Sequence, residues 1–219
     1  MHPDFWHERW QKNQIGFHQG EINLHLQQFW SKLNVAPGSR VFVPLCGKSG
    51  DMLWLRAQGY EVVGVELSPL AVQAFFAEND LQATICTQGS FSLYEADGIR
   101  IYCGDFFDLN ADDLTGLSAV YDRASLIALP PETRKEYVSH LCKLFPAGSH
   151  MLLVTLDYPQ LEMDGPPFAV SDQEVRWLYE GKGRIEQLAS CDRLAENEKF
   201  RERGITGLYE NVYLIELSG

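Results

Sequence analysis

The sequence predicts an α/β fold, a doubly wound and mostly parallel sheet with helices on both faces, because strand and helix patterns alternate along it. Residues 41–45 form an apolar run that meets a glycine turn at Gly47 and Gly50, and a helical pattern follows. A second apolar run then ends on a single acid, Glu66. A strand, a tight turn, a helix and a parallel strand in this order form the unit that binds nucleosides at strand ends.

The segments after this unit continue the alternation. Ser68 and Pro69 are typical of an N-cap and a first helical residue, and their helix is expected to end near Asn79. The further expected elements are a hairpin over residues 91–102 with its turn at 97–98, strands over 119–123, 151–156 and 209–217, a helix from 131 that stops at 148, and a helix opened by a capping box at 171–174.

Length and composition limit the classes of protein to consider. A chain of 219 residues is expected to form one domain, residues 1–219, and its 45% hydrophobic residues suffice for one core. The net charge of −12 opposes binding to nucleic acid, and no apolar run of 18 residues predicts a membrane span. The five scattered cysteines predict reduced thiols and no metal site. Since the first ten residues lack the features of a signal peptide, a cytoplasmic protein is expected.

The glycine turn narrows the choice of nucleotide. A phosphate-binding P-loop needs a glycine five positions before Gly47, where the sequence has Phe42, so Lys48 is expected in solvent. A dinucleotide site needs two closely spaced glycines, but bulky residues occupy 44–46. S-adenosylmethionine has an adenosine and no phosphate, and Glu66, 19 residues after Gly47, suits its ribose. The residues alone favour S-adenosylmethionine, while a nicotinamide cofactor and a ligand-free domain remain alternatives.

Motifs that follow one another over nearly the whole chain resemble one family. They are Trp6 and Trp10 with Phe17-His18, VFVPLCGKSGDM at 41–52, VVGVELS at 62–68, CGDFFDL at 103–109, DRASL at 122–126, GPPF at 165–168 and LYENVYL at 208–214. With them the chain resembles the bacterial members of the thiopurine S-methyltransferase family, which belongs to the class I S-adenosylmethionine-dependent methyltransferases. The resemblance implies a Rossmann-like sheet of seven mostly parallel strands with an antiparallel last strand. It also implies methyl transfer to aromatic or heterocyclic thiols such as thiopurines, and bacterial relatives are associated with methylation of selenium and tellurium compounds.

Strand ends supply the expected contacts to the cofactor. Glu66 is expected to accept hydrogen bonds from the ribose hydroxyls, and Gly47 gives the ligand clearance. Asp105 and Phe106 directly follow the third core strand, where an acid can hold the adenine amino group and a ring can stack on the base. The backbone carbonyl of Leu45 is expected to accept from the methionine amino group.

Arg123, at the tip of the fourth strand, is the candidate with an electrostatic role. It is expected to hold the methionine carboxylate or to stabilise an anionic acceptor, and an ion pair with Asp122 is the alternative. Methyl transfer to sulfur is an in-line displacement, and heterocyclic thiols are largely thiolate near neutral pH. Alignment and exclusion of water then suffice, so no general base is nominated, although His18 is a candidate.

The N-terminal aromatic residues have two interpretations. Trp6 and Trp10 lie one helical turn apart, and this pattern alone favours core packing. The resemblance instead implies that Trp10 covers the cofactor and that Phe17 lines the acceptor pocket. Residues 1–35 are accordingly expected to cover cofactor and substrate, and residues 36–219 to form the α/β core, as a monomer.

The acceptor side is less well defined. Residues 158–170, with three prolines, are expected to form a lid over a small thiol or selenol substrate. Lys199, Arg201 and Arg203 compete for the role of an acceptor-side cation, and the sequence does not choose among them.

Other functions remain as alternatives or are disfavoured. A nucleic-acid amino-methyltransferase needs an acid or amide before Pro-Pro and an aromatic after it, whereas residues 128–132 read ALPPE. No cluster of Asp and Asn ligands predicts a metal-dependent catechol methyltransferase. A nicotinamide-dependent oxidoreductase stays open as the second enzyme class, and a protein that binds S-adenosylmethionine without methylating thiols stays open as a non-enzyme.

Overall fold

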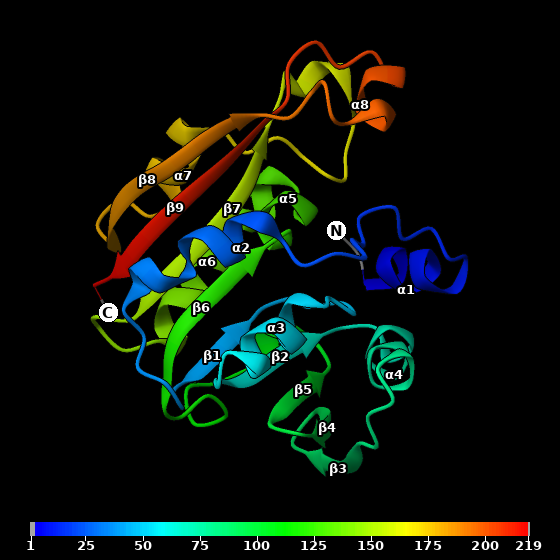
Figure 1. The fold of residues 1–219 in the computed structure, drawn as a ribbon, viewed down its shortest axis with the longest axis vertical. Helices are drawn as coiled ribbons and strands as arrows, with labels where there is room; N and C mark the ends of the chain where they lie inside the picture. The colour runs from blue at the N-terminus through cyan, green and yellow to red at the C-terminus, as the bar shows by residue number, and fades with distance from the viewer. Residues whose placement is uncertain (1–2, 219) are drawn as a thin grey trace.

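The structure of the protein, a computed structural model, describes residues 3–218 and contains one mixed sheet (Figure 1). Its strands are β1 (Arg40–Val43), β2 (Glu61–Glu66), β3 (Thr84–Gln88), β4 (Phe91–Ala96), β5 (Ile99–Cys103), β6 (Leu117–Arg123), β7 (His150–Asp157), β8 (Gly183–Asp192) and β9 (Tyr209–Leu217). They lie in the order β3-β4-β5-β2-β1-β6-β7-β9-β8. The central strands from β5 to β7 are parallel, and β3, β4, β8 and β9 pair antiparallel. The predicted α/β fold and the antiparallel last strand are confirmed.

The sheet has nine strands, and the expectation of seven is wrong. The two unanticipated strands are β3 and β8, which form the two edges. Every residue of β3 is exposed, and β8 mixes half-buried and exposed residues around a register shift between Gln187 and Ala189. β3 has no alternation, and in β8 the alternation of half-buried and exposed residues is interrupted at the register shift, so neither strand gives the continuous pattern from which a strand is predicted.

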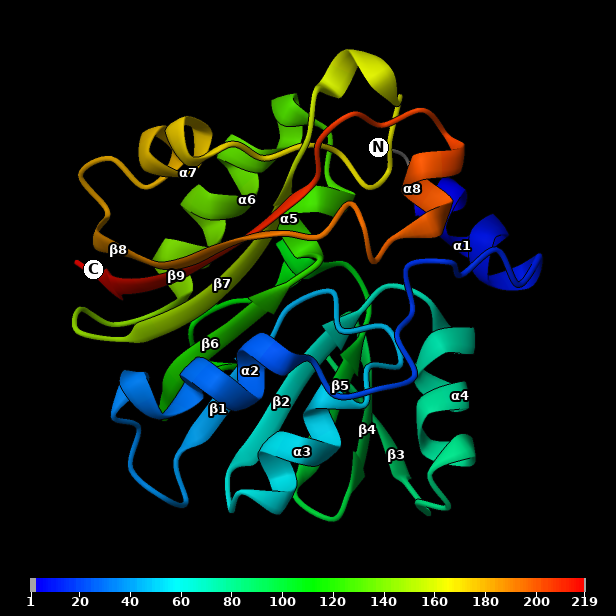
Figure 2. The same ribbon diagram turned by 45° about the horizontal axis from the view of Figure 1, so that its top comes forward.

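Helices cover both faces of the sheet (Figure 2). On one face lie α2 (Leu24–Phe29), α3 (Asp51–Ala57) and α4 (Pro69–Glu78), and on the other α5 (Ser125–Ala128), α6 (Pro131–Leu144) and α7 (Asp172–Leu178). Short 3₁₀ turns are η1 (Trp30–Leu33), η2 (Phe106–Asp108) and η3 (Gln160–Glu162). Both views show α1 (Pro3–Gln11) and α8 (Glu198–Glu202) beyond the end of the sheet toward which β6 and β7 point.

Local sequence signals act as expected at several boundaries. Ser68 Oγ accepts from the backbone N–H of Ala71 at 3.4 Å, and α4 ends at Glu78, one residue before the expected end. The turn between β4 and β5 has positive φ at Asp97 and Gly98, 46° and 73°. At α7 only half of the capping box forms, because the Glu174 carboxylate pairs with the buried Arg134 at 2.6 Å.

Within residues 3–218, no helix combines the length and the apolar character needed to cross a membrane.

Candidate cofactor and acceptor site

The predicted cofactor residues lie together at the carboxyl ends of the parallel strands. Leu45 and Gly47 follow β1, Glu66 ends β2, Asp105 follows β5, and Arg123 ends β6. These four strands are neighbours in the order β5-β2-β1-β6 and run parallel. Their carboxyl ends therefore lie side by side, where ligands bind in doubly wound sheets.

The turn after β1 has an unusual backbone. Leu45 and Gly47 both have positive φ, 44° and 54°, and the N–H of Cys46 donates to the carbonyl of Val65 at 3.0 Å. The Ser125 hydroxyl donates to the Pro44 carbonyl at 3.0 Å. Positive φ in a residue with a side chain is uncommon and is favoured only where the surroundings hold it, so this turn is a built feature.

Glu66 is held at this turn by two hydrogen bonds. Its side chain is buried, its Oε2 accepts from the N–H of Gly47 at 2.9 Å, and its Oε1 accepts from the N–H of Ser68 at 2.7 Å. Burial raises the pKa of Glu66, and the two backbone bonds oppose that rise. Each carboxylate oxygen has a second lone pair, so the group can also accept from a pair of hydroxyls.

Aromatic residues of the N-terminal segment lie over the same turn. A Cβ atom on Gly47 would stand 3.4 Å from Cζ2 of Trp10, so the indole packs against the bare backbone of this glycine. Phe17 lies edge-on to both Trp10 and Trp6, with ring centroids 5.7 Å apart in each case. Phe17 is 38% exposed. The structure thus brings Trp10 to the glycine turn, with Phe17 packed against Trp10, although α1 has no buried residue.

Arg123 is half-buried, and its neighbour Asp122 is fully buried. Asp122 accepts from the Tyr137 hydroxyl at 2.8 Å, and no ion pair joins it to Arg123 among the described residues. Ala124 then adopts positive φ, 73°, before α5 begins. The chain turns sharply here, with the Arg123 side chain left at the strand end.

The residues after β5 occupy different environments. Asp105 is half-buried and accepts from the N–H of Phe107 at 2.9 Å. Phe106 is 3% exposed and packs against Tyr137 and His140, with ring centroids 4.8 and 5.1 Å away. Its ring belongs to the core in this structure, whereas the ring of Phe107 is 40% exposed.

The expectation that Lys48 lies in solvent is wrong. Its side chain is 12% exposed, and its Nζ contacts both carboxylate oxygens of Glu78, at 2.6 and 2.8 Å. Burial, with the charges of Lys48 and Arg123, lowers the pKa of His18, and Glu78 opposes them. Two cations and a histidine therefore gather beside the turn, a grouping that joins residues distant in the sequence and has no local signal.

A cavity of about 330 Å³ lies at the same end of the sheet, where β7 ends and β9 begins. It is lined by Asp157, Tyr158, Pro159, Thr206, Gly207 and Tyr209. In the sheet order β7 is three strands away from β2, so this cavity is separate from Glu66. The sequence signal for it was only indirect, since the proposed lid at 158–170 begins here.

The structure does not single out one of the three candidate acceptor-side cations. Lys199, Arg201 and Arg203 are all exposed, and Nη1 of Arg203 lies 3.2 Å from Sδ of Met163 in the 158–170 segment. In the part of the chain that the structure describes, no group of three or more His, Cys, Asp or Glu side chains is arranged to hold a metal ion.

The buried Asp122 makes stability depend on pH. Burial raises its pKa from 3.8 to about 6, so the folded state keeps a proton that the unfolded state has already lost. The free energy of unfolding therefore falls as pH rises from about 4 to 6. We expect wild type to lose about 2 kcal/mol more than Asp122→Asn between pH 4 and 7, measured by urea denaturation. Parallel profiles for the two proteins would show an ordinary pKa at this position.

Comparison with solved structures identifies the fold. The chain matches the *Burkholderia thailandensis* 1,6-didemethyltoxoflavin-N1-methyltransferase bound to S-adenosylhomocysteine, with TM-score 0.65, 13% identity, and 99% and 87% of the two chains covered. It matches *Haemonchus contortus* phosphoethanolamine N-methyltransferase 2 with TM-score 0.64 and 9% identity over 88% of this chain, which spans about half (52%) of that one. The fold is that of the class I methyltransferases.

Sequence comparison identifies the family. The family model described as Thiopurine S-methyltransferase (TPMT) matches residues 1–218. The chain is 55% identical over 215 residues to a thiopurine S-methyltransferase of *Nitrosospira multiformis*, with 98% of both chains covered. It is also 55% identical over 216 residues to one of *Pseudomonas aeruginosa*, with 99% of both covered. The chain belongs to the thiopurine S-methyltransferase family, and it is a methyltransferase that uses S-adenosylmethionine as methyl donor.

Proposed function

We propose that this enzyme transfers the methyl group of S-adenosylmethionine to the sulfur of aromatic and heterocyclic thiols, including thiopurines. The observation that carries the proposal is the full-length similarity to relatives named thiopurine S-methyltransferase. The buried carboxylate of Glu66 beside the glycine turn adds a chemical reason, because it suits an adenosine that carries no phosphate.

The donor would be held by the strand ends. Glu66 accepts from the ribose hydroxyls, the Leu45 carbonyl accepts from the methionine amino group, and Gly47 leaves room for the ligand. Asp105 holds the adenine amino group. For Phe106 a role at the adenine requires its ring to leave the core, or the contact to come from its backbone.

The chemical step would need positioning more than proton transfer. A sulfur lone pair of the thiolate forms the new S–C bond while the bond from the methyl carbon to the sulfonium sulfur breaks, and S-adenosylhomocysteine leaves as a neutral thioether. Arg123 binds the methionine carboxylate and favours the thiolate, with Lys48 nearby. Because the acceptor arrives as a thiolate, no catalytic base is assigned, and alignment in a dry site supplies most of the rate.

Two segments would enclose the reactants. Residues 1–35 bring Trp10 over the cofactor and Phe17 to the acceptor, and residues 158–170 close the other side beside the cavity at β7. Met1, His2 and Gly219 of the single domain lie outside the described residues. We propose a cytoplasmic monomer, with small selenium and tellurium compounds as further acceptors because selenolates are nucleophiles of the same kind.

A panel of matched acceptors tests the proposed reaction. Purified enzyme is assayed for S-adenosylhomocysteine release with thiophenol, phenol and aniline, which share one ring and differ in the nucleophilic atom. Selenophenol and selenite form a second arm, and NAD and NADP serve as cofactor controls. We expect turnover with thiophenol and none with phenol or aniline. Turnover of aniline would reassign the enzyme to amines, and cofactor binding without any turnover would leave a binding protein.

A further inference from the structure

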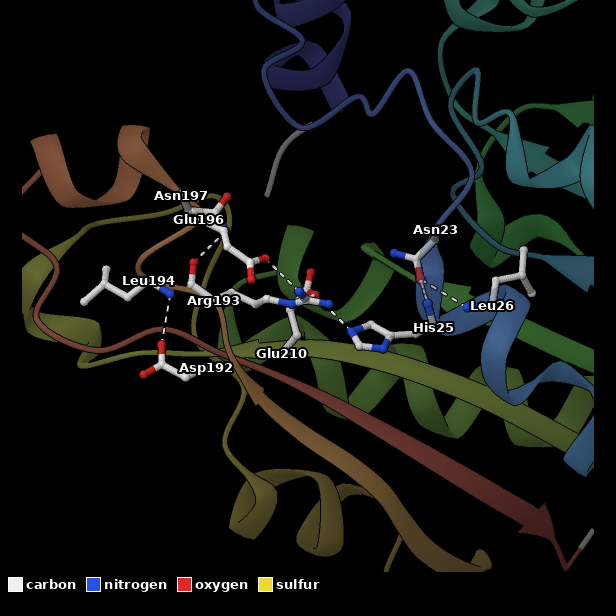
Figure 3. A network of polar contacts seen from close by, with 9 residues as sticks. All are labelled: Asn23, His25, Leu26, Asp192, Arg193, Leu194, Glu196, Asn197 and Glu210. Atoms are coloured by element: carbon white, nitrogen blue, oxygen red, sulfur yellow. Dashed lines mark hydrogen bonds and ion pairs between the residues drawn. The ribbon is translucent and has the colours of Figure 1, made fainter.

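A polar network joins the N-terminal segment to the last two strands (Figure 3). One oxygen of Glu210, Oε2, lies 3.0 Å from Nε2 of His25 on α2 and 3.1 Å from Nε of Arg193, just after β8. The three side chains are largely buried, with 20%, 3% and 19% exposed for Glu210, His25 and Arg193. Burial raises the pKa of Glu210, but the contacts with His25 and Arg193 outweigh it and lower that pKa.

On one side the network continues to the glycine turn. Asn23 caps α2 by accepting from the N–H groups of His25 and Leu26, at 3.0 and 3.2 Å. The N–H of Asn23 donates to Oδ1 of Asp51 at 2.8 Å, and the Tyr121 hydroxyl donates to Oδ2 at 2.9 Å. Asp51 is buried and is the first residue of α3, directly after the turn that holds Glu66.

On the other side the network enters residues 193–208, here called the C-terminal corner. Nη1 of Arg193 lies 2.7 Å from Glu196, and the Asn197 side chain donates to the Arg193 carbonyl at 2.9 Å. The backbone N–H of Arg193 donates to the Leu208 carbonyl at 2.8 Å, which closes the base of the corner. The corner carries α8 and with it Lys199 and Arg201.

The C-terminal corner and the 158–170 segment form one packed unit. Glu162 accepts from the backbone N–H and the hydroxyl of Thr206, at 2.8 and 2.7 Å. Tyr158, Ile205 and Leu208 form a small buried cluster of their own. A shift of the corner would therefore carry the proposed lid with it.

We propose that Glu210 and Arg193 are positioning residues that fix the acceptor cover, the C-terminal corner with the 158–170 segment, relative to the glycine turn that holds the cofactor. The assignment rests on the proposed function for its kinetic consequence. It predicts that breaking the link misplaces the thiol while leaving the cofactor site intact, because Glu66 and Gly47 hold each other independently of the network.

The contacts of Glu210 favour a role in positioning the acceptor cover over a role only in stabilising the β8–β9 pair. A partly buried oxygen shared by two donors fixes the direction of both, and β9 and β8 are already paired along nine registered positions. The bonds at Glu210 add little to that pairing. Together they connect the C-terminal corner, through Arg193 and Glu210, to His25 on α2, a different part of the chain.

The test compares Arg193→Ala, Arg193→Lys and Glu210→Gln with a matched control, Arg40→Ala. Arg40 pairs with Glu61 at 2.7 Å at the opposite end of the sheet. We expect the thiol KM of Arg193→Ala and Glu210→Gln to rise about tenfold, the Kd for S-adenosylhomocysteine to change less than about twofold, and Arg193→Lys to recover most of the loss. Arg40→Ala should match wild type in both quantities.

A second measurement does not depend on turnover. Amide hydrogen exchange with S-adenosylhomocysteine bound should become at least several-fold faster over residues 193–208 and 158–170 in Glu210→Gln, and stay unchanged over residues 40–66. Unchanged exchange in the cover overturns the positioning role, as does a thiol KM within twofold of wild type or a cofactor Kd that weakens in parallel. If wild type itself methylates no thiol, the proposed function fails, and the exchange measurement alone decides this inference.

Discussion

Replacing Glu66 by glutamine weakens binding of S-adenosylhomocysteine by about 1–3 kcal/mol, roughly 5- to 150-fold in Kd. In the wild-type protein the Glu66 carboxylate accepts from the N–H groups of Gly47 and Ser68 and has lone pairs left for the ribose hydroxyls. An amide has one acceptor oxygen, and its NH₂ group would face a backbone donor or a ribose hydroxyl. The loss therefore combines weaker ribose bonds with a disturbed turn. Isothermal titration calorimetry gives the affinity directly.

Glu61→Gln is the matched control for this measurement. Glu61 is the first residue of β2, the strand that ends at Glu66, and therefore lies at the opposite end of the strand. Its carboxylate pairs with Arg40. Its substitution should leave the cofactor affinity unchanged. Thermal unfolding of both variants separates a local loss from a general loss of fold. A Glu66→Gln protein that binds S-adenosylhomocysteine as wild type does would remove Glu66 from the cofactor site.

Deleting residues 1–18 lowers kcat/KM about a hundredfold and shifts the melting temperature by only a few degrees. The deletion removes Trp10 from Gly47 and removes Phe17, so the reacting atoms meet bulk water. Stability should hold because α1 contributes no buried residue to the core. Steady-state kinetics and thermal unfolding of the shortened chain measure the two effects.

Single substitutions show which part of the segment matters. Trp10→Ala should reproduce much of the loss in kcat/KM, because its indole is the group against Gly47. Trp177→Ala serves as the control, since Trp177 is 53% exposed on α7, on the other face of the sheet. A shortened chain with full activity would return Trp10 and Phe17 to simple packing. A shortened chain that no longer folds would show that the segment is structural.

The central part of the fold could be predicted because its signals are local. The apolar runs around Gly47 and Glu66 lie in adjacent parallel strands, and such runs identify buried strands without knowledge of the partner. Ser68 marks a helix start because an N-cap acts within one turn. The edges β3 and β8 were missed because an edge strand needs no buried alternation.

The sequence predicts the position of a site residue only where that residue lies at the end of a strand. Glu66 lies at the turn as its spacing from Gly47 predicts, but nothing in the sequence pairs Lys48 with Glu78, 30 residues away. His25 and Glu210 meet across 185 residues, which no spacing rule describes. For Phe106 and Phe107 the sequence gives two adjacent rings, and only packing against Tyr137 decides which one enters the core.

The most direct test of the account is the position of the transferred methyl group on an acceptor that offers several nucleophiles. 6-Mercaptopurine presents one sulfur and several ring nitrogens, and S-adenosylmethionine labelled with ¹³C in its methyl group reports the site of attack by NMR. The account predicts a single S-methyl product, formed at a rate that falls in Glu66→Gln. An N-methyl product, or no transfer while S-adenosylhomocysteine binds, would contradict it.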